Sequence, residues 1–357
     1  MLVIRPTYHR NRARSLITAT AAALALGAAP AAASTLVITG AGDGHGVGMS
    51  QDGALEYAQH SYSYAAILAH YYTSTALGQV PANTNVRVLV GSKVKKVPLE
   101  RYVRGVVAAE MPSGWPLAAL EAQAVASRTY ALTAHAGGSR FDVYSDTRSQ
   151  VYRGMAAETA QTNTAIAATA GQIVTYGGKP AITYFFASSG GMTESIENSF
   201  IGSAPEPWLV GVADPYDSGT PSAWKISMSF ATAAARLRGL VKGTFQGIEV
   251  LTRGVSPRIV SAQVLGSGGR MAVSGPELAG RLGLQGTWAY FNVKHGKTTT
   301  AEPDASSQPA PTAPPTASPT PTGPQGGAQG PGAPPSTVAG PQGGAQASSL
   351  AGGAVAG

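Results

Sequence analysis

One carboxylate, Glu110, lies in a stretch of sequence that favours acid–base chemistry. Valine and alanine precede it over a full helical turn without any cation, and Met111, Pro112 and Trp115 follow it closely. A carboxyl group held against apolar and aromatic surface has a raised pKa, because its charged form is poorly solvated, and a raised pKa suits a general acid. The alternative is a structural ion pair between Glu110 and a downstream arginine. The spacing alone leaves both interpretations open.

Two predicted helices, joined by a sharp corner, position Glu110. Pro98 suits the first turn of a helix, because its missing N–H would have no partner there. This helix carries a hydrophobic face and ends at Met111, since the residue before Pro112 is pushed out of the helical region. Pro116 opens the second helix, which has a narrow packing face of small residues. The two helices can therefore approach each other closely.

This region resembles the signature block of the SpoIID/LytB family, the stage II sporulation protein D and amidase-enhancer group of bacterial cell-wall proteins; it reads VVAAEMPSGWPLAALEAQAVASRTYAL. The resemblance implies that Glu110, in AAEMP, is the catalytic acid/base of a lytic transglycosylase that acts on peptidoglycan glycan strands. It implies that Arg128, in SRTY, is needed for activity or substrate binding, and it places Gln123, in AQAV, with the substrate-binding residues. The family usually has Lys where this chain has Glu121, a reversal of charge that affects substrate contacts on that face.

A glycine-rich segment, GAGDGHGVGMSQDGA, precedes this block. Glycine at every second position permits close approach of another backbone or a ligand, although a flexible loop has the same composition. The segment resembles the family's second signature, GHGVGMSQ-x-GA, which usually follows the AAEMP block and here comes first, as in actinobacterial members. The resemblance implies that His45, Ser50 and Gln51 contact substrate. Ser50 is also predicted to cap the helix that follows.

The two signature blocks are expected to meet in space. Glu110, Arg128 and the His45 loop would then line one cleft. An arginine too close to Glu110 would lower the pKa of that carboxyl and spoil it as an acid. We therefore expect Arg128 to reach the sugar, while Trp115 or Met111 shields Glu110.

A third motif, SSGGMTES, resembles the family's S-x-SGG-x-TE loop. Its glycine pair and hydroxyl groups suit a sugar-binding rim, and the resemblance places Ser188, Ser189 and Glu194 there. An ordinary polar turn is the alternative.

The segment FDVYSDTRSQVYRG resembles a family segment in which some members bind zinc through two Cys and one His. The corresponding residues here are Tyr144, Arg148 and Ser149, and none of them is a good zinc ligand. We therefore predict no zinc site and no other cofactor. Hydrogen bonding around Asp142, Asp146 and Arg148 is expected to hold the segment instead.

Residues 1–33 are typical of a secretory signal peptide. Arginines precede a short, alanine-rich apolar segment, and three consecutive alanines at 31–33 offer a cleavage site. The apolar segment is short for a membrane span, so an uncleaved anchor is the less favoured alternative and no transmembrane segment is expected after cleavage. This predicts a secreted protein associated with the cell wall. Because the chain has no cysteine, it must fold without disulfides.

The charge of the chain argues against a nucleic-acid partner. Removal of the four arginines of the signal peptide lowers the formal charge from +7 to +3 (7 − 4). A charge of this size supports only mild attraction to an anionic wall. The expected partners are peptidoglycan glycan strands and, in addition, a cell-wall amidase.

The remaining pattern predicts an α+β fold over residues 34–296, a single SpoIID-like domain of helices packed on short, mostly antiparallel strands. A hairpin with strands at 172–176 and 180–187 is predicted across the Gly177–Gly178 pair. From 297 to 357 the composition turns to Pro, Gly, Ala, Ser, Thr and Gln, which predicts a disordered tail.

Two functions compete. Ordinary glycosidases need two carboxylates, whereas a lytic transglycosylase can work with one, because the C6 hydroxyl of muramic acid attacks intramolecularly. The alternative is a non-catalytic glycan-binding protein or amidase enhancer, which Glu121 and a shortened middle segment favour. A penicillin-binding serine enzyme is a third class, since S-x-x-K occurs at Ser92 and Ser222, but neither S-D-N nor K-T-G follows.

Overall fold

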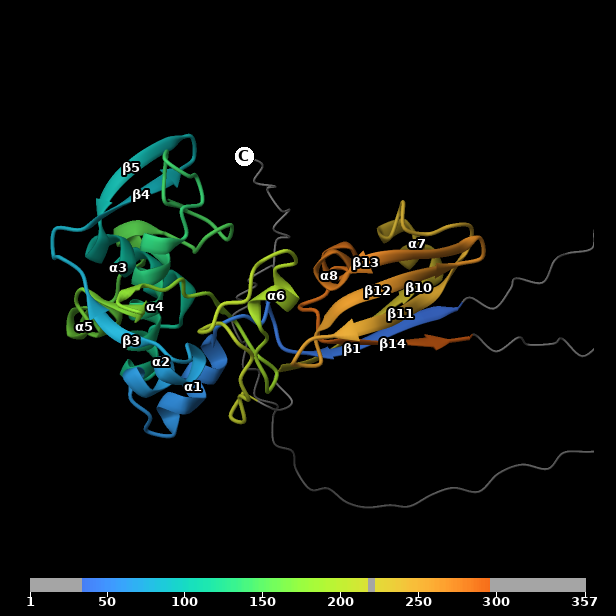
Figure 1. Cartoon of the computed structure of the whole chain (residues 1–357), viewed down its shortest axis with the longest axis horizontal. Helices are drawn as coiled ribbons and strands as arrows, with labels where there is room; N and C mark the ends of the chain where they lie inside the picture. The colour runs from blue at the N-terminus through green and yellow to red at the C-terminus, as the bar shows by residue number, and fades with distance from the viewer. Residues whose placement is uncertain (1–33, 218–221, 296–357) are drawn as a thin grey trace, which may run out of the picture.

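Figure 1 shows the computed structural model of the chain, which describes residues 34–217 and 222–295. The predicted signal peptide (1–33) and the predicted tail (297–357) lie outside the described residues. Within the described ranges, the buried apolar side chains form two clusters. We call the parts that enclose them the helical lobe (43–217) and the sheet lobe (34–42 and 222–295).

The sheet lobe contains two small antiparallel sheets. In one, β1 lies between β10 and β14; in the other, β12 lies between β11 and β13. The elements are β1 (Thr35–Ala41), β10 (Ala223–Ser229), α7 (Phe230–Arg236), β11 (Phe245–Arg253), β12 (Ile259–Gly266), β13 (Gly269–Ser274), α8 (Gly275–Leu282) and β14 (Ala289–Lys294). Because β1 pairs with strands from the far end of the chain, the helical lobe is inserted between the neighbouring strands β1 and β10 (Figure 1).

The helical lobe holds the three motifs that the sequence singles out. Its elements are β2 (Met49–Ser50), α1 (Gln51–Gln59), α2 (Tyr64–Tyr71), β3 (Ala76–Gln79), β4 (Asn85–Val90), β5 (Lys93–Pro98), α3 (Leu99–Glu110), α4 (Leu117–Thr133), β6 (Val143–Tyr144), the 3-10 helix η1 (Gly154–Ala157), α5 (Ala160–Ala168), β7 (Gln172–Tyr176), β8 (Lys179–Pro180), β9 (Phe185–Phe186) and α6 (Ile196–Ser199). Helices packed on short, largely antiparallel strands confirm the predicted α+β class.

Local signals in the sequence place several helix ends correctly. α3 begins directly after Pro98 and ends before Met111, and α4 begins directly after Pro116, as the proline positions predict. Ser50 caps α1, because its Oγ accepts a hydrogen bond from the N–H of Gly53 at 3.1 Å.

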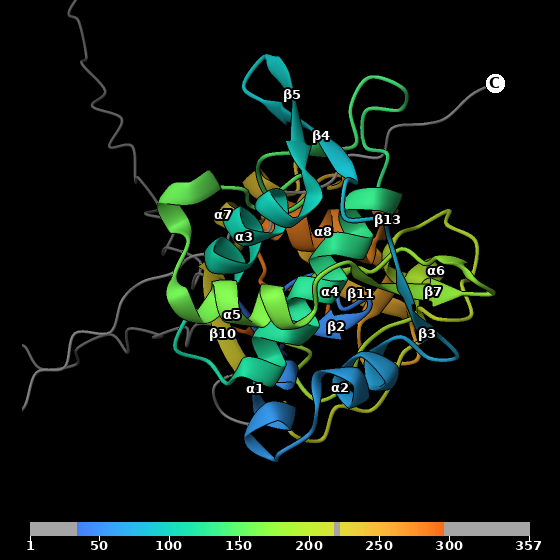
Figure 2. The same ribbon diagram turned by 90° about the vertical axis from the view of Figure 1, so that its left-hand side faces the viewer.

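Helix α4 lies at the centre of the helical lobe, with α3 and α5 on one side and α1 and α2 below it in Figure 2. The sequence predicts one narrow packing face for this helix. In the structure its middle part is buried nearly all round, including the polar residues Gln123, Ser127, Arg128 and Thr129. A helix surrounded by other elements loses its solvent face, so these polar groups need partners within the protein.

The predicted hairpin around Gly177–Gly178 forms, but its second strand is short. β8 covers only Lys179–Pro180, after which the chain continues to β9 and pairs in parallel with β2. The carbonyl of Tyr184 accepts hydrogen bonds from the N–H of Met49 and the hydroxyl of Tyr72. These bonds direct the chain toward the glycine-rich segment instead of back along β7.

A buried carboxylate, Glu194, joins the two lobes. Its side chain is fully buried and accepts hydrogen bonds across the joint from the N–H of Val255 (3.0 Å), the N–H of Ser256 (3.1 Å) and the hydroxyl of Ser256 (2.5 Å). Ser195 and Asn198 donate to it from its own lobe. Hydrogen bonds to a charged acceptor are among the stronger ones in proteins, so this carboxylate fixes the β11–β12 turn against the helical lobe.

A buried arginine crosses the same joint in the opposite direction. Arg258 of the sheet lobe donates to the carbonyls of Met192 (2.7 Å) and Ser189 (3.0 Å), and its guanidinium lies 5.7 Å from the ring centres of Phe186 and Trp288. Burial lowers the pKa of Arg258 to about 10, which still leaves it charged at neutral pH.

No helix within 34–217 or 222–295 combines the length and the hydrophobicity that crossing a bilayer requires.

The joint generates a stability prediction. Val255 donates to one carboxylate oxygen of Glu194 and Ser256 donates to the other, so Glu194→Gln, which replaces one of these oxygens by a donor NH2 group, leaves one of the two sets of donors without an acceptor. We expect the free energy of unfolding to fall by about 3 kcal/mol. Chemical denaturation measures this change. The control is Glu197→Gln on α6, which leaves all of these bonds in place and should change stability by no more than about 0.5 kcal/mol. Equal stability of the two variants would contradict the role assigned to Glu194.

Candidate functional site

Glu110 is the last residue of α3 and is half-buried, with the corner formed by Met111 and Pro112 immediately after it. Burial raises the pKa of its carboxyl above the usual value. Hydrogen bonds from the N–H of Val151 (2.5 Å) and from the side chain of Gln51, together with the charge of Arg153, act in the opposite direction. The carboxyl is therefore shielded from water but is supported in its charged form.

The structure decides between the two interpretations that the sequence leaves open for Glu110. Among the described residues, no cation lies within ion-pair distance of this carboxylate. Arg153 acts on Glu110 only through its charge. Glu110 therefore forms no structural ion pair with the residues that the structure describes.

A chain of buried amide groups links Glu110 to the middle of α4. Gln51, at the start of α1, donates to Glu110 and also to Gln123 Oε1 at 3.4 Å. Gln123 donates to the hydroxyl of Ser127 at 2.9 Å, and Gln150 donates to the carbonyl of Ser127 at 3.1 Å. The two signature blocks therefore meet at the catalytic candidate, as expected, through Gln51 and Gln123.

The loop from β6 to η1 closes over the end of α3. Its Val151 N–H binds Glu110, and the N–H of Arg153 donates to the carbonyl of Gly105 at 3.1 Å. Gly105 has to be glycine here, because a Cβ would lie 2.6 Å from the ring of Tyr152 and 2.8 Å from the backbone of Gly154. The absence of a side chain on α3 thus lets the loop approach Glu110.

The predicted hydrogen bonding of this loop is confirmed. Arg148 pairs with Asp146 at 2.7 Å, and its guanidinium stacks over Tyr144, 3.9 Å from the ring centre. Ser149 accepts a hydrogen bond from the N–H of Tyr144, and Asp142 pairs with Arg87 of β4. The positions at which some family members hold zinc are therefore engaged in a cation–π and hydrogen-bonded cluster. The absence of a bound metal remains a prediction.

Aromatic side chains extend from Glu110 toward the glycine-rich segment. Tyr130 of α4 is close enough for the charge of Glu110 to act on it, and burial is the main cause that raises the pKa of Tyr130 to about 12. Its ring centre lies 5.9 Å from that of Tyr184, which in turn lies 6.0 Å from His45.

His45 lies at the far end of this aromatic row, with Phe186 and Phe200 as further ring contacts. Its Nδ1 accepts a hydrogen bond from the N–H of Val47 at 3.1 Å. Burial and the nearby charge of Arg258 lower the pKa of His45 to about 4, so the ring is neutral at physiological pH. His45 therefore contributes to the aromatic wall, whereas Gln51 is the residue of its block that reaches Glu110.

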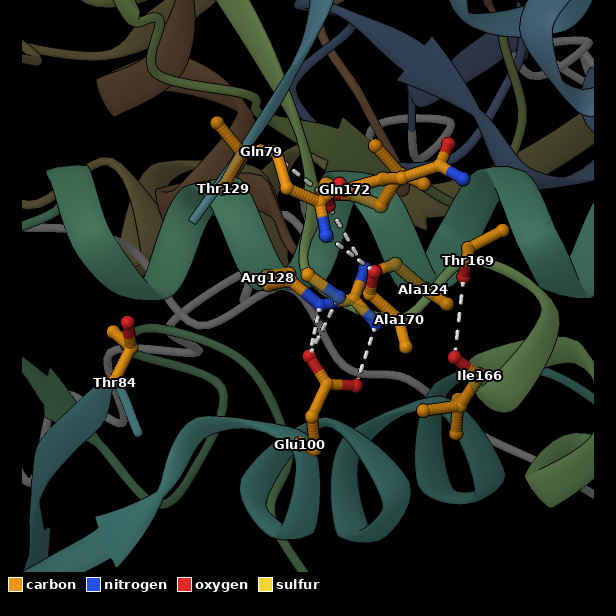
Figure 3. Close-up of polar contacts among 12 residues, drawn as sticks. Gln79, Thr84, Glu100, Ala124, Arg128, Thr129, Ile166, Thr169, Ala170 and Gln172 are labelled. Carbon is orange, nitrogen blue, oxygen red and sulfur yellow. Dashed lines mark hydrogen bonds and ion pairs between the residues drawn. The ribbon is translucent and has the colours of Figure 1, made fainter. Parts of the chain in front are cut away.

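The expected placement of Arg128 is wrong. Its side chain is fully buried and makes a two-pronged ion pair with Glu100 of α3, at 2.8 and 2.9 Å (Figure 3). It also donates to the carbonyls of Gln172 and Ala124. A fully buried guanidinium that makes four hydrogen bonds inside the protein is not exposed to a sugar, so Arg128 fixes α4 to α3 and β7.

The serine positions are also structural. Ser50, Ser188 and Ser189 surround the buried carboxylate of Asp217: the hydroxyl of Ser50 donates to it at 2.6 Å and that of Ser188 at 2.9 Å, and Ser189 donates through its N–H. All three are buried. Glu194, in the same motif, forms the lobe joint. The predicted sugar-binding rim is therefore corrected: these residues satisfy one another inside the protein, because the tight glycine turns of the motif direct them inward.

Several residues of the site were not predicted. The N–H of Val151 is a backbone group and gives no signal in the sequence. Gln150 and Arg153 belong to the segment that resembles the family's zinc-binding region, and Tyr130 belongs to SRTY, so motif membership was the available signal.

The comparisons with known proteins fit this geometry. The SpoIID family, described as Stage II sporulation protein, matches residues 91–176. This range contains Glu110, Gln123, Ser127 and Val151, whereas Gln51 lies before it. Residues 91–176 thus form a SpoIID region, and two of the relatives described below are named stage II sporulation protein D and amidase enhancer.

Three relatives share this region. An uncharacterized protein of Brachyspira hyodysenteriae is 38% identical over 140 residues, which are 38% of each chain. Stage II sporulation protein D of Bacillus subtilis is 33% identical over 170 residues, 43% of this chain and 49% of the relative. The amidase enhancer of Bacillus subtilis is 33% identical over 127 residues, 36% of this chain and 17% of the relative. The chain thus spans less than half the length of each of these relatives.

The buried position of Arg128 generates a second prediction. Arg128→Met leaves Glu100 without its partner, and we expect the free energy of unfolding to fall by about 3 kcal/mol. Arg270→Met, which breaks the exposed pair with Glu249, should cost less than about 1 kcal/mol. Thermal and chemical unfolding of both variants measure the difference. A substrate-binding Arg128 would instead leave stability unchanged and weaken only glycan binding.

Proposed function

We propose that this protein is a peptidoglycan lytic transglycosylase that cleaves glycan strands between N-acetylmuramic acid and N-acetylglucosamine with Glu110 as its single acid/base. The observation that carries the proposal is the state of Glu110: half-buried, free of any ion pair within the described residues, and raised in pKa by burial. A raised pKa favours the protonated form that a general acid needs, and the carboxyl can give up this proton in a reaction.

In the first step, the carboxyl of Glu110 donates its proton to the glycosidic oxygen. The bond between this oxygen and C1 of the muramic acid breaks, and the N-acetylglucosamine leaves with a 4-hydroxyl group. The hydrogen bonds from Val151 and Gln51 stabilise the carboxylate that forms. Because these donors belong to different elements packed on α3, they are in place before the reaction starts.

In the second step, the Glu110 carboxylate takes the proton from the C6 hydroxyl of the muramic acid as that oxygen attacks C1. The product is a 1,6-anhydro ring, and no water is consumed. A nucleophile within the substrate replaces the second carboxylate of ordinary glycosidases. In agreement, no other acidic side chain is among the groups that shift the pKa of Glu110.

The aromatic row formed by Tyr130, Tyr184 and His45 is proposed to accommodate the sugar rings beside Glu110. The ordered contacts of these rings favour flat, apolar ligand faces. Export through the predicted signal peptide and association with the cell wall belong to the same proposal, since the substrate lies outside the cytoplasm.

A non-catalytic glycan binder or amidase enhancer is the second candidate. It is favoured by the relative named amidase enhancer and by Glu121, a half-buried residue of α4 that replaces the family's usual lysine. The chemistry of the products distinguishes the candidates, because only cleavage releases 1,6-anhydro-muramyl ends.

Glu110→Gln tests the proposal directly. This change keeps the shape of the side chain and removes the proton chemistry, so we expect the rate of anhydro-product release to fall by about 100- to 10,000-fold, while fold and glycan binding are retained. Mass spectrometry of glycan strands incubated with each protein, with and without stem peptides, measures the products. Unchanged release by the variant would show that Glu110 is not the acid.

The pH dependence provides an independent check. Activity requires protonated Glu110, so kcat/KM should fall as the pH rises through the pKa of this residue, which lies above the usual glutamate value. The charge of Arg153 lowers the pKa of Glu110. Arg153→Gln removes this charge, so the pH at which kcat/KM falls should be higher in this variant. Arg238→Gln, an exposed change in the sheet lobe, should leave this pH unchanged. An unchanged or lower pH in Arg153→Gln would contradict the assignment.

A further inference from the structure

A basic hollow lies on the surface where β5 meets α3. It has a volume of about 490 Å³, and Lys95, Lys96 and Arg101 supply its charges. Tyr152 and Met155, from the loop that closes over α3, form its apolar side. The three basic residues are exposed. We refer to this feature as the basic hollow.

The charges of the basic hollow have no carboxylate partner in the part of the chain that the structure describes. Among the described residues, none of Lys95, Lys96 and Arg101 lies within ion-pair distance of a carboxylate. The acceptor of Arg101 is the sulfur of Met155 at 3.0 Å, which is a weak acceptor. Unbalanced cations gathered around one hollow repel each other and favour an anion from outside.

The fold removes the carboxylates that would otherwise neutralise this surface. Glu100 neighbours Arg101 in the first turn of α3, but its carboxylate forms a two-pronged ion pair with the buried Arg128 (Figure 3). Lys96 lies opposite Arg87 across the β4–β5 ladder, and Arg87 takes up the charge of Asp142. Both carboxylates are thus paired with other arginines, which leaves the cations of the hollow without a carboxylate partner among the described residues.

The loop after β6 links the basic hollow to the Glu110 site. Arg101 and Glu110 lie on the same helix, separated by roughly 13 Å along its axis at about 1.5 Å per residue. The loop that begins with Val151, whose N–H binds Glu110, places Tyr152 and then Met155 in the hollow. Tyr152 is held in position by stacking on Tyr102, with ring centres 5.0 Å apart. Arg101 and Glu110 point to opposite sides of α3, because they are nine residues apart at about 3.6 residues per turn. A chain polymer bound at Glu110 would therefore reach the hollow by following this loop around the helix.

We propose that the basic hollow binds carboxylate groups of the glycan strand whose bond lies at Glu110. This inference rests on the proposed function, because it assigns the anion to that substrate. Muramic acid carries a lactyl ether whose carboxyl is free when no peptide is attached, and stem peptides carry carboxylates of their own. Arginine binds such groups with two parallel hydrogen bonds, and lysine adds positive charge.

The test uses the triple variant Lys95→Gln, Lys96→Gln and Arg101→Gln in the Glu110→Gln background, where binding can be measured without cleavage. The probes are peptide-free glycan strands with free carboxyls, the same strands with methyl-esterified carboxyls, and strands that retain their peptides. We expect the triple change to weaken binding of free-carboxyl strands by roughly tenfold and to leave binding of esterified strands unchanged. Added salt should likewise weaken binding of only the free-carboxyl strands.

The matched control removes two lysines and one arginine elsewhere, as Lys179→Gln, Lys225→Gln and Arg238→Gln, all of which are exposed. It should bind every probe as the parent does. If the triple variant binds peptide-free strands more weakly, the bound carboxylate belongs to the lactyl ether. If it binds only the peptide-bearing strands more weakly, the bound carboxylate belongs to the peptide. Equal binding by the triple variant and the control, or equal effects on esterified strands, would overturn the inference.

The same experiment separates this inference from the proposed function. Each triple change is also made with Glu110 intact, and anhydro products are measured. If cleavage proceeds with an unchanged KM in the hollow variant, the function stands and the basic hollow has no role. If no protein releases anhydro products but the binding difference persists, the hollow is a carboxylate site of a binding module and the transglycosylase proposal is wrong.

Discussion

Helix α4 imposes the main constraint on the helical lobe, because it brings polar side chains into a core where water cannot reach them. An unsatisfied polar group in such a place costs about 1 to 3 kcal/mol, and more if it is charged. Each group is satisfied from a different element: Gln123 by α1, Arg128 by α3 and Thr129 by β7. The positions of the surrounding elements are therefore fixed by hydrogen bonding as well as by apolar packing.

The state of Glu110 follows from this arrangement. Burial at the end of α3 disfavours its charge, while donors from α1 and from the loop after β6 stabilise that charge. These effects oppose each other, and burial is the larger one, so the pKa of the carboxyl is raised. Gly105 is essential to the balance, since a side chain there would push the loop, and with it the Val151 N–H, away from the carboxylate.

The two ion pairs of β4 and α3 have a further consequence. By pairing with Glu100 and Asp142, Arg128 and Arg87 leave the surface cations of β5 and α3 without a carboxylate partner among the described residues. Interior stability and surface charge are thus coupled here. The polar residues of the SSGGMTES motif likewise act inside the protein, because they hold the turn and the lobe joint together.

The sequence by itself determined the features that depend on neighbouring residues. Pro98, Pro112 and Pro116 fix backbone geometry locally, so the limits of α3 and α4 and the corner beside Glu110 could be predicted, and the hydroxyl of Ser50 caps its own helix. Only the tertiary structure decided which buried group binds which. Arg128, Ser188 and Glu194 have polar side chains that suit sugars and protein interiors equally well, and their actual partners lie far away in the sequence. The donor at Val151 is a backbone N–H, which every residue except proline carries, so its contact with Glu110 depends only on the path of the folded chain.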